Sequence, residues 1–287
     1  MRHCTGLLAH ALIYVTAHRP SFGPASPIPV ITDPLFYLLA IPAVILLGLG
    51  KGGFAGLGMI CVPLLTLRVP ILQGAAIILP LLVTQDAISV WTYRRTWSTW
   101  NLKVLVPGAI IGMSAGTAFA SHVSNAAVEL VGGLIGLSFV LYRWLGRWLW
   151  PHLLRSAENT SRPHAVVGVF WGSLAGFMSL LVNVGTPPYQ IHILPQRLEK
   201  LTFVGTTVMF FAFMNLMKIG PYFLLGQFSL RNFATSMALL PLAVASNFTG
   251  IWLVRRTSTE RFYRVTYLLM FCISLALIWQ GGTALRH

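Results

Sequence analysis

The amino-acid sequence predicts an all-α integral membrane protein, a polytopic helical bundle built from two inverted repeats. Three observations lead to this fold class: an apolar composition, long apolar runs, and a repeat within the chain. Of the 287 residues, 56% are hydrophobic and only 9% are charged, whereas a soluble domain carries about 25% charged residues. Lipid must therefore be the solvent for most of the surface.

Eight apolar runs are long enough, or nearly so, for the ~20 residues of a helix that spans a bilayer. They lie at about 35–50, 71–92, 102–121, 126–145, 165–182, 201–224, 230–254 and 262–280. Two shorter apolar pieces, 54–67 and 186–196, contain or follow glycines and prolines, which break helices. We therefore expect eight full transmembrane helices plus two broken or short segments.

The basic residues indicate whether the two short pieces cross the membrane. If both cross, thirteen Lys and Arg residues lie on one side and five on the other, with Lys51 and Lys218 inside the membrane. If neither crosses, the split falls to eleven and seven. Because cytoplasmic loops are enriched in basic residues, we expect both pieces to cross and residues 255–264 to be cytoplasmic. A re-entrant hairpin is the alternative for either piece.

An internal repeat supports the same number of passages. An offset of 131 residues places Glu129 on Glu260 and lays residues 52–56 over 183–187, so the two broken pieces become counterparts. Five passages in each half are an odd number, which turns the second half upside down relative to the first. Inverted repeats with paired interrupted helices recur in transporters, whose substrate site lies near the midplane where the breaks meet.

This repeat divides the chain into four parts. Residues 35–145 are the first membrane repeat and 164–281 the second, joined by a cytoplasmic linker at 146–163. Residues 1–34 form an N-terminal extension, whose apolar stretch at 6–17 is too short to span as a helix. We expect the extension to be disordered or interfacial, and a cleaved signal is the alternative.

The charge balance indicates the partners. The formal net charge is +14, from twenty Lys and Arg against six acidic residues. The basic residues fall between apolar runs, as in loops that face anionic lipid, and they form no recognisable nucleic-acid module. We expect membrane lipid and a small anionic substrate as partners, with no nucleic acid. The histidines and cysteines show no ligand spacing, so neither a metal nor a cofactor is predicted. The oligomeric state is not indicated.

The densest signal is the glycine cluster at residues 48–58, around Lys51. Glycines at 52, 53 and 56 let the backbone turn and point several N–H groups at one anion, and Lys51 adds a positive charge. We therefore predict that Lys51, Gly52, Gly53 and Gly56 bind substrate. The alternative is close helix packing, which small residues at this spacing also serve.

The counterpart loop contributes the second set of substrate-binding candidates. Pro187 and the proline after it stop a helix, while Asn183, Thr186 and Gln190 offer neutral hydrogen bonds to an oxyanion. Gly185 completes the predicted set. A polar turn at the membrane surface is the alternative interpretation of this loop.

Asp86 and Lys218 lie inside apolar runs that the repeat makes equivalent. An ionisable group at that depth is costly and suggests function, so we predict that both residues serve coupling. Asp86 would carry a proton or bind a cation, and Lys218 would attract an anion. The alternatives are an ion pair of Asp86 with a lysine such as Lys51 or Lys218, and a Lys218 side chain that reaches the membrane surface.

Several motifs are similar to those of the TauE/SafE family of sulfite exporters. They are Gly48–Met59, Tyr93–Arg95 with Trp100–Leu102, Leu194–Lys200, Phe203–Thr207 and Arg255–Arg264, within a resemblance that covers roughly residues 36–280. The resemblance implies export of small sulfur-bearing oxyanions, such as sulfite or sulfonates, across the bacterial inner membrane. Relatives usually have His-x-Gly-Gly-Pro-Pro in the second loop, whereas this chain has Asn183 and Thr186 at the changed positions.

We conclude that the sequence predicts a multi-pass secondary transporter, an exporter of small anions, with proton coupling as a further expectation. A passive anion channel and a membrane-embedded enzyme are the alternatives. An enzyme would need a catalytic dyad or a metal set, for which the chain offers only Lys51, Asp86, Lys218 and a lone His192. We therefore do not expect an enzyme.

Overall fold

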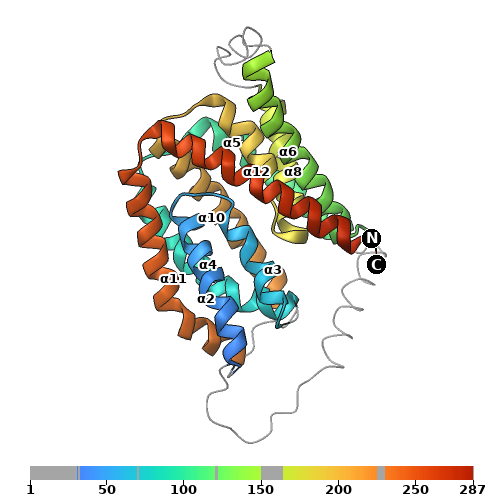
Figure 1. The fold of residues 1–287 in the computed structure, drawn as a ribbon, viewed down its shortest axis with the longest axis vertical. Helices are drawn as coiled ribbons and strands as arrows, with labels where there is room; N and C mark the ends of the chain where they lie inside the picture. The colour runs from blue at the N-terminus through green and yellow to red at the C-terminus, as the bar shows by residue number, and fades with distance from the viewer. Residues whose placement is uncertain are drawn as a thin grey trace, which may run out of the picture.

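The described part of the chain folds into a bundle of eight long helices, two of which precede broken segments (Figure 1). The computed structural model describes residues 31, 33–69, 71–119, 122–149, 164–224 and 230–286. Within these residues, eight helices are long and apolar enough to cross a membrane, which confirms the predicted number. They are α2 (Pro34–Gly52), α4 (Ile71–Tyr93), α5 (Thr99–Phe119), α6 (Asn125–Leu149), α8 (Ala165–Val182), α10 (Lys200–Leu224), α11 (Leu230–Arg256) and α12 (Thr259–Ala284).

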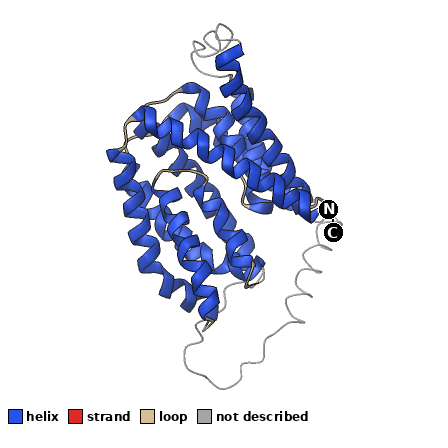
Figure 2. Cartoon of the chain, in the orientation of Figure 1, coloured by secondary structure: helices blue, strands red, loops and turns tan. Residues whose placement is uncertain are grey.

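Figure 2 shows helices joined by loops throughout the described part of the chain. The predicted N-terminal extension, apart from its last few residues, and most of the predicted linker lie outside that part. Asp33 begins α2 by accepting the N–H of Leu35 at 3.0 Å, and Pro34 occupies the first helical turn. Both features are typical helix starts, because the cap satisfies a free N–H and proline needs none.

Short helices form the two predicted broken segments. The first contains η1 (Leu57–Ile60) and α3 (Cys61–Thr66), and the second contains α9 (Thr186–Ile193) and η2 (Leu194–Gln196). At ~1.5 Å per residue, α3 and α9 extend only about 9 and 12 Å, against a bilayer core of about 30 Å. Neither short helix can span the membrane alone, as expected.

Helix α11 runs beside α4 and gives its direction. Near the start of α11, Ser236 donates to the carbonyl of Ile77 at 2.7 Å. Farther along, Asn247 accepts a hydrogen bond from Ser89 of α4 at 3.1 Å. Residue numbers rise together along both helices, so α4 and α11 are parallel.

Helix α2 is parallel to α11 as well. Ile31, just before α2, donates its N–H to Thr235 at 3.4 Å, and Ser246 donates to the carbonyl of Val44 at 3.3 Å. The consecutive long helices α2 and α4 therefore run in the same direction. The chain between them, which contains η1 and α3, must return across the bundle.

The second half repeats this arrangement with α8 and α10. The start of α8 packs beside the start of α5, and Thr206 near the start of α10 accepts the N–H of Ser98, which directly precedes α5. At the far ends, Lys218 of α10 donates to Ser179 of α8. Because α8 and α10 are parallel, the segment with α9 and η2 must also return. Both broken segments therefore cross between the two ends of the bundle, as the charge bias predicts.

Counterpart helices of the two halves pack antiparallel. Asn215 of α10 bonds Asp86 of α4, whereas Gly205, a few residues after the start of α10, lies against the carbonyl of Thr96 beyond the end of α4. Helices α6 and α12 are likewise antiparallel, while α5 packs on α8 and α2 packs on α11. The first long helix of each half therefore packs on the third long helix of the other half. This reciprocal packing, together with the antiparallel counterparts, confirms the predicted inverted repeat.

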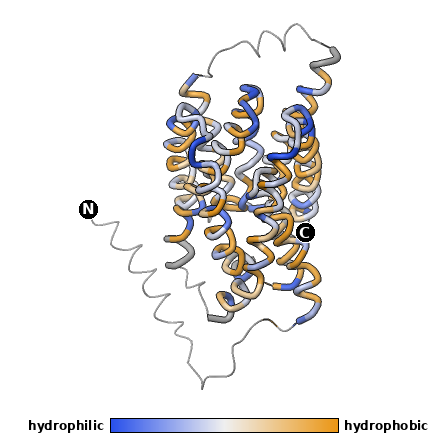
Figure 3. Tube along the Cα trace, turned by 90° about the vertical axis from the view of Figure 1, so that its left-hand side faces the viewer, coloured by the Kyte–Doolittle hydropathy of each residue, from blue (hydrophilic) through white to orange (hydrophobic). Residues whose placement is uncertain are grey.

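The outer surface is apolar and the basic residues gather at one end. Figure 3 shows hydrophobic residues along the helices, and large apolar side chains such as Leu38, Val166 and Trp279 are exposed on the outside. We call the end where α4 and α11 finish and α5, α10 and α12 begin the basic end. Its described basic residues are Arg94, Arg95, Lys103, Arg143, Arg147, Arg197, Lys200, Arg255, Arg256, Arg261 and Arg264. The positive-inside rule predicts that the basic end is cytoplasmic.

Candidate functional site

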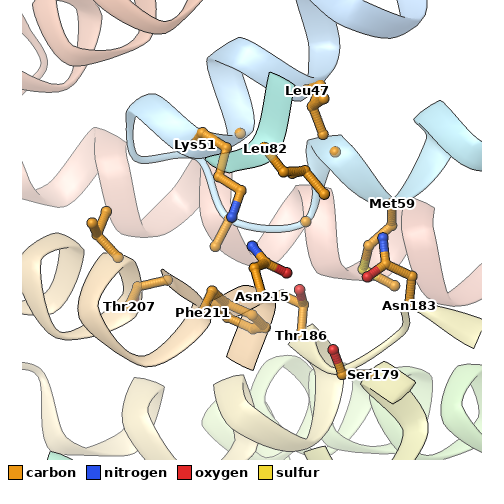
Figure 4. A pocket seen from close by; sticks show the side chains of 15 residues that line it. Leu47, Lys51, Met59, Leu82, Ser179, Asn183, Thr186, Thr207, Phe211 and Asn215 are labelled. Atoms are coloured by element: carbon orange, nitrogen blue, oxygen red, sulfur yellow. The ribbon is translucent and has the colours of Figure 1, made fainter. Parts of the chain in front are cut away.

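A small cavity lies where the two broken segments meet (Figure 4). Its volume is about 80 Å³, which is small beside the ~300–1,000 Å³ of pockets for drug-sized ligands. It is lined by Leu47, Gly50, Lys51, Ala55, Gly56, Gly58, Met59, Leu82, Ser179, Asn183, Thr186, Thr207, Val208, Phe211 and Asn215. Both halves of the chain contribute, and the size suits an ion of few atoms.

Two glycines turn the first loop into the cavity. Helix α2 ends at Gly52, and Gly53 and Gly56 then adopt φ angles of 146° and 110°. Residues with a side chain rarely adopt these positive φ angles, so glycine is needed at both turns. A Cβ on Gly56 would also lie 2.6 Å from Cδ1 of Ile273. Lys51 lies in the last turn of α2, directly before these glycines, and its side chain lines the cavity.

Other glycines of the same cluster serve helix packing. A Cβ on Gly52 would lie 2.7 Å from backbone atoms of Gly250 on α11, and a Cβ on Gly48 would lie 2.7 Å from the Cβ of Ser246 and still closer to its Oγ. The carbonyl of Gly52 accepts a hydrogen bond from Tyr93 at 2.9 Å. The cluster therefore divides between two locations: Gly48 and Gly52 pack on α11, which confirms the packing interpretation for them, whereas Gly50, Gly56 and Gly58 line the cavity. Substrate binding by the cluster stays a prediction.

The second loop is shaped by Asn183 and the residues after it. Asn183 caps α8 in the left-handed conformation, with φ 59°, which Asn tolerates better than most residues. Thr186 begins α9 and lines the cavity, whereas Gly185 and Pro187 are buried in contacts outside it. Gln190 donates to the carbonyl of Ala55 at 3.3 Å and so ties the second loop to the first.

Asp86 and Lys51 form an ion pair beside the cavity. Lys51 Nζ lies 2.6 Å from Asp86 Oδ1, and Asn215 donates to Asp86 Oδ2 at 2.7 Å. The side chains of Lys51 and Asp86 are only 15% and 8% exposed. The sequence left two lysines, Lys51 and Lys218, as possible partners of Asp86. The structure pairs Asp86 with Lys51. The charges of this pair cancel, so Lys51 adds little net charge to the cavity while Asp86 is ionised.

Lys218 is buried with neutral partners. Its Nζ donates to Ser179 Oγ at 2.7 Å and to Asn183 Oδ1 at 2.8 Å, and the residue is 5% exposed. Among the described residues, no carboxylate lies within ion-pair distance of it. Both partners belong to the last turn and cap of α8, where the helix dipole favours a cation. When protonated, Lys218 thus places a positive charge without a carboxylate partner next to the cavity wall.

The structure brings together only part of the predicted substrate set. Lys51, Gly56, Asn183 and Thr186 line the cavity, and the remaining predicted residues lie behind them. Sequence reasoning missed several polar and aromatic lining residues: Ser179, Thr207, Phe211 and Asn215. Asn215 had a detectable signal, because it is a polar residue within an apolar run, one helical turn before Lys218.

His192 takes part in a separate network. Its Nε2 lies 3.1 Å from Oδ1 of Asn101, which in turn accepts from Gln196 at 2.9 Å. These residues hold the second broken segment against the start of α5 and do not line the cavity. In the part of the chain that the structure describes, no three potential metal ligands cluster together.

Eight spanning helices in two inverted halves, with broken segments that meet at a small cavity, define a polytopic membrane protein of the transporter type. A family model described as "Sulfite exporter TauE/SafE" matches residues 40–277, and the chain belongs to this family. Comparisons with curated proteins and with solved structures gave no match.

Proposed function

We propose that the protein is a secondary transporter that exports small anions, sulfite or sulfonate-type organosulfur compounds, across the bacterial inner membrane. One observation carries the proposal: the ammonium group of Lys218 is buried with only neutral partners, and both of them line the cavity. A buried charge without a counterion is costly. An anion in the cavity would remove that cost.

The cavity wall supplies hydrogen-bond donors for such an anion. Asn183 accepts from Lys218 through Oδ1, which leaves its Nδ2 free to donate to an oxyanion. The Thr186 hydroxyl is a second donor in the lining, at the start of α9, where the helix dipole favours an anion. Gly52, Gly53, Gly185, Pro187 and Gln190 would hold the two loops in position around the ion.

Proton coupling would act through Asp86. When Asp86 is ionised, it neutralises Lys51 at 2.6 Å. Protonation of Asp86 would release the Lys51 charge, so that two ammonium groups would attract an anion, that of Lys51 in the lining and that of Lys218 behind Ser179 and Asn183. A protonated transporter would therefore bind an anion more tightly, which couples anion binding to the protonation of Asp86.

Flux into proteoliposomes tests the proposal. Radiolabelled sulfite, a taurine-like sulfonate and a simple carboxylate would be compared as substrates of the full chain. We expect saturable flux of the sulfur oxyanions. A charge-assisted hydrogen bond contributes about 1.5–3 kcal/mol, so Lys218→Gln should weaken anion binding by at least tenfold.

Two control variants sharpen the test. Lys218→Arg keeps the charge and should keep part of the binding, although the planar guanidinium differs in shape from an ammonium. Lys103→Gln removes an exposed lysine at the basic end and should leave flux unchanged. Unaltered anion affinity in Lys218→Gln would overturn the proposed site, and discrete unitary currents in single-channel recordings would indicate a channel instead.

A further inference from the structure

A second cavity lies at the basic end, between the ends of α4 and α11 and the start of α10. Its volume is about 340 Å³, which is within the ~300–1,000 Å³ range of ligand pockets. It is lined by Thr92, Tyr93, Thr96, Lys200, Leu201 and Arg255. None of these residues lines the cavity between the broken segments.

The lining of this cavity carries two positive charges. Lys200 donates to the backbone carbonyl of Thr257 at 2.5 Å, and Arg255 makes no ion pair with any described residue. Glu199, the acid next to Lys200 in sequence, is exposed, and its carboxylate accepts a long 3.5 Å hydrogen bond from the Thr202 hydroxyl. The cavity therefore presents two basic side chains to an oxyanion without an acidic partner.

Tryptophans place the cavity at the level of lipid headgroups. Trp91 is 71% exposed and has the guanidinium of Arg94 over its ring at 3.9 Å. Trp252 is 56% exposed with Arg256 at 5.7 Å from its ring. Trp91 lies in the last turn of α4 and Arg94 directly follows that helix, while Trp252 and Arg256 lie in α11, so both pairs are close in sequence to the cavity residues Tyr93 and Arg255. Exposed tryptophans near basic residues are typical of the interface between the membrane and water.

We propose that this cavity binds the headgroup of an anionic phospholipid, with Lys200 and Arg255 on the phosphate. Basic pockets between transmembrane helices on the cytoplasmic side suit such headgroups. The cavity is also connected to the first broken segment, because Tyr93 in its wall donates to the carbonyl of Gly52 at 2.9 Å. A bound headgroup would thus stabilise the end of α4 that holds the first broken loop.

The proposal does not depend on the transported substrate. The probe is dioctanoyl phosphatidylglycerol, titrated into the purified full chain in a neutral detergent while the melting temperature and the number of retained lipids are measured. Native mass spectrometry gives the second readout. Dioctanoyl phosphatidylcholine and inorganic phosphate at the same concentrations separate an anionic lipid from a zwitterionic one and from free phosphate.

The double variant Lys200→Gln/Arg255→Gln removes both charges and keeps a hydrogen-bond donor for Thr257. Each basic residue near an anionic lipid contributes about fivefold in affinity, so the double variant should bind roughly thirtyfold more weakly. Arg261→Gln/Arg264→Gln is the matched control, because it removes two exposed charges at the same end but outside the cavity. We expect this control to keep most of the wild-type affinity.

Three results would overturn the proposal. The first is undiminished phosphatidylglycerol binding in the double variant, and the second is equal loss in the control variant. The third is equal stabilisation by inorganic phosphate, which would make the cavity a site for free oxyanions. If the double variant fails to fold, the single variants Lys200→Gln and Arg255→Gln carry the same test, with about a fivefold loss expected for each.

Discussion

Lys218 and Asn183 form a 2.8 Å hydrogen bond at the place in the second half that the Lys51–Asp86 ion pair occupies in the first. The partners are 35 residues apart in both pairs. Lys51 and Asn183 end the helices before the two breaks, whereas Asp86 and Lys218 lie on the antiparallel helices α4 and α10. The repeat thus places a charge-neutral pair on one side of the cavity and a single ammonium on the other.

The first prediction concerns the ion pair. Asp86→Asn leaves Lys51 buried without a counterion, and breaking a buried pair costs about 3–5 kcal/mol. We expect a clear fall in melting temperature for Asp86→Asn and for Lys51→Gln. The double variant should recover most of the loss, because it leaves no unpaired charge. Melting of all four proteins forms a double-mutant cycle, and strict additivity would contradict a direct interaction.

The same variants separate a structural role from proton coupling. If Asp86 carries the proton, the double variant should be folded and bind anion, yet its flux should no longer respond to a pH gradient. Flux in proteoliposomes with and without an imposed gradient measures this response. A double variant that still accumulates anion with the gradient would show that the proton travels by another group.

The second prediction concerns the backbone of the first loop. Gly56→Ala should destabilise the fold, because φ of 110° is strained for a side chain by about 1–3 kcal/mol and Ile273 blocks the added methyl. Gly282→Ala is the control, since Gly282 lies in a helix with open space around it. Alanine should stabilise that helix by up to about 1 kcal/mol. Similar melting temperatures for the two variants would show that the loop tolerates a side chain.

The helices and their inversion could be predicted from the sequence because each rests on local information. A run of about 20 apolar residues determines a spanning helix, and the basic clusters determine on which side it ends. The two breaks were equally visible, since a glycine cluster and a Pro-Pro pair stop helices wherever they occur. These features need no knowledge of how one helix is rotated against another.

The composition of the site depended on rotations that the sequence does not encode locally. Asp86 had two candidate partners, Lys51 and Lys218, and only the packing of α4 against α2 and α10 assigns Lys51 to it. Ser179 and Thr207 resemble many other polar residues in apolar helices until α8 and α10 are placed side by side. The repeat offset also differs by one residue at the site: Lys51 and Asn183 are 132 positions apart, whereas the offset of 131 fits the flanking loops.

The third prediction concerns the sides of the membrane. In a variant without Cys4, Cys61 and Cys272, Ser258→Cys at the basic end should resist an impermeant thiol reagent added to intact cells. Ala284→Cys, at the opposite end of the 26-residue helix α12, should react, because ~39 Å of helix separates the two positions. Reaction of both residues, or the reverse pattern, would contradict a cytoplasmic basic end.

The last prediction converts the second half into a copy of the first. Asn183→Asp places a carboxylate 2.8 Å from Lys218 Nζ, and aspartate tolerates the left-handed backbone at this position much as asparagine does. The new ion pair would neutralise the ammonium that we propose attracts the substrate. We therefore expect anion binding to fall at least tenfold while the melting temperature stays level or rises.

Asn183→Gly is the matched control, since it keeps the backbone conformation and removes the neutral acceptor without adding charge. It also removes the Nδ2 donor, so we expect it to lose part of the anion binding but less than Asn183→Asp, because Lys218 would still need a counterion. Binding to purified protein, measured by calorimetry alongside melting, distinguishes the two variants. Wild-type affinity in Asn183→Asp would mean that the anion does not depend on the charge of Lys218.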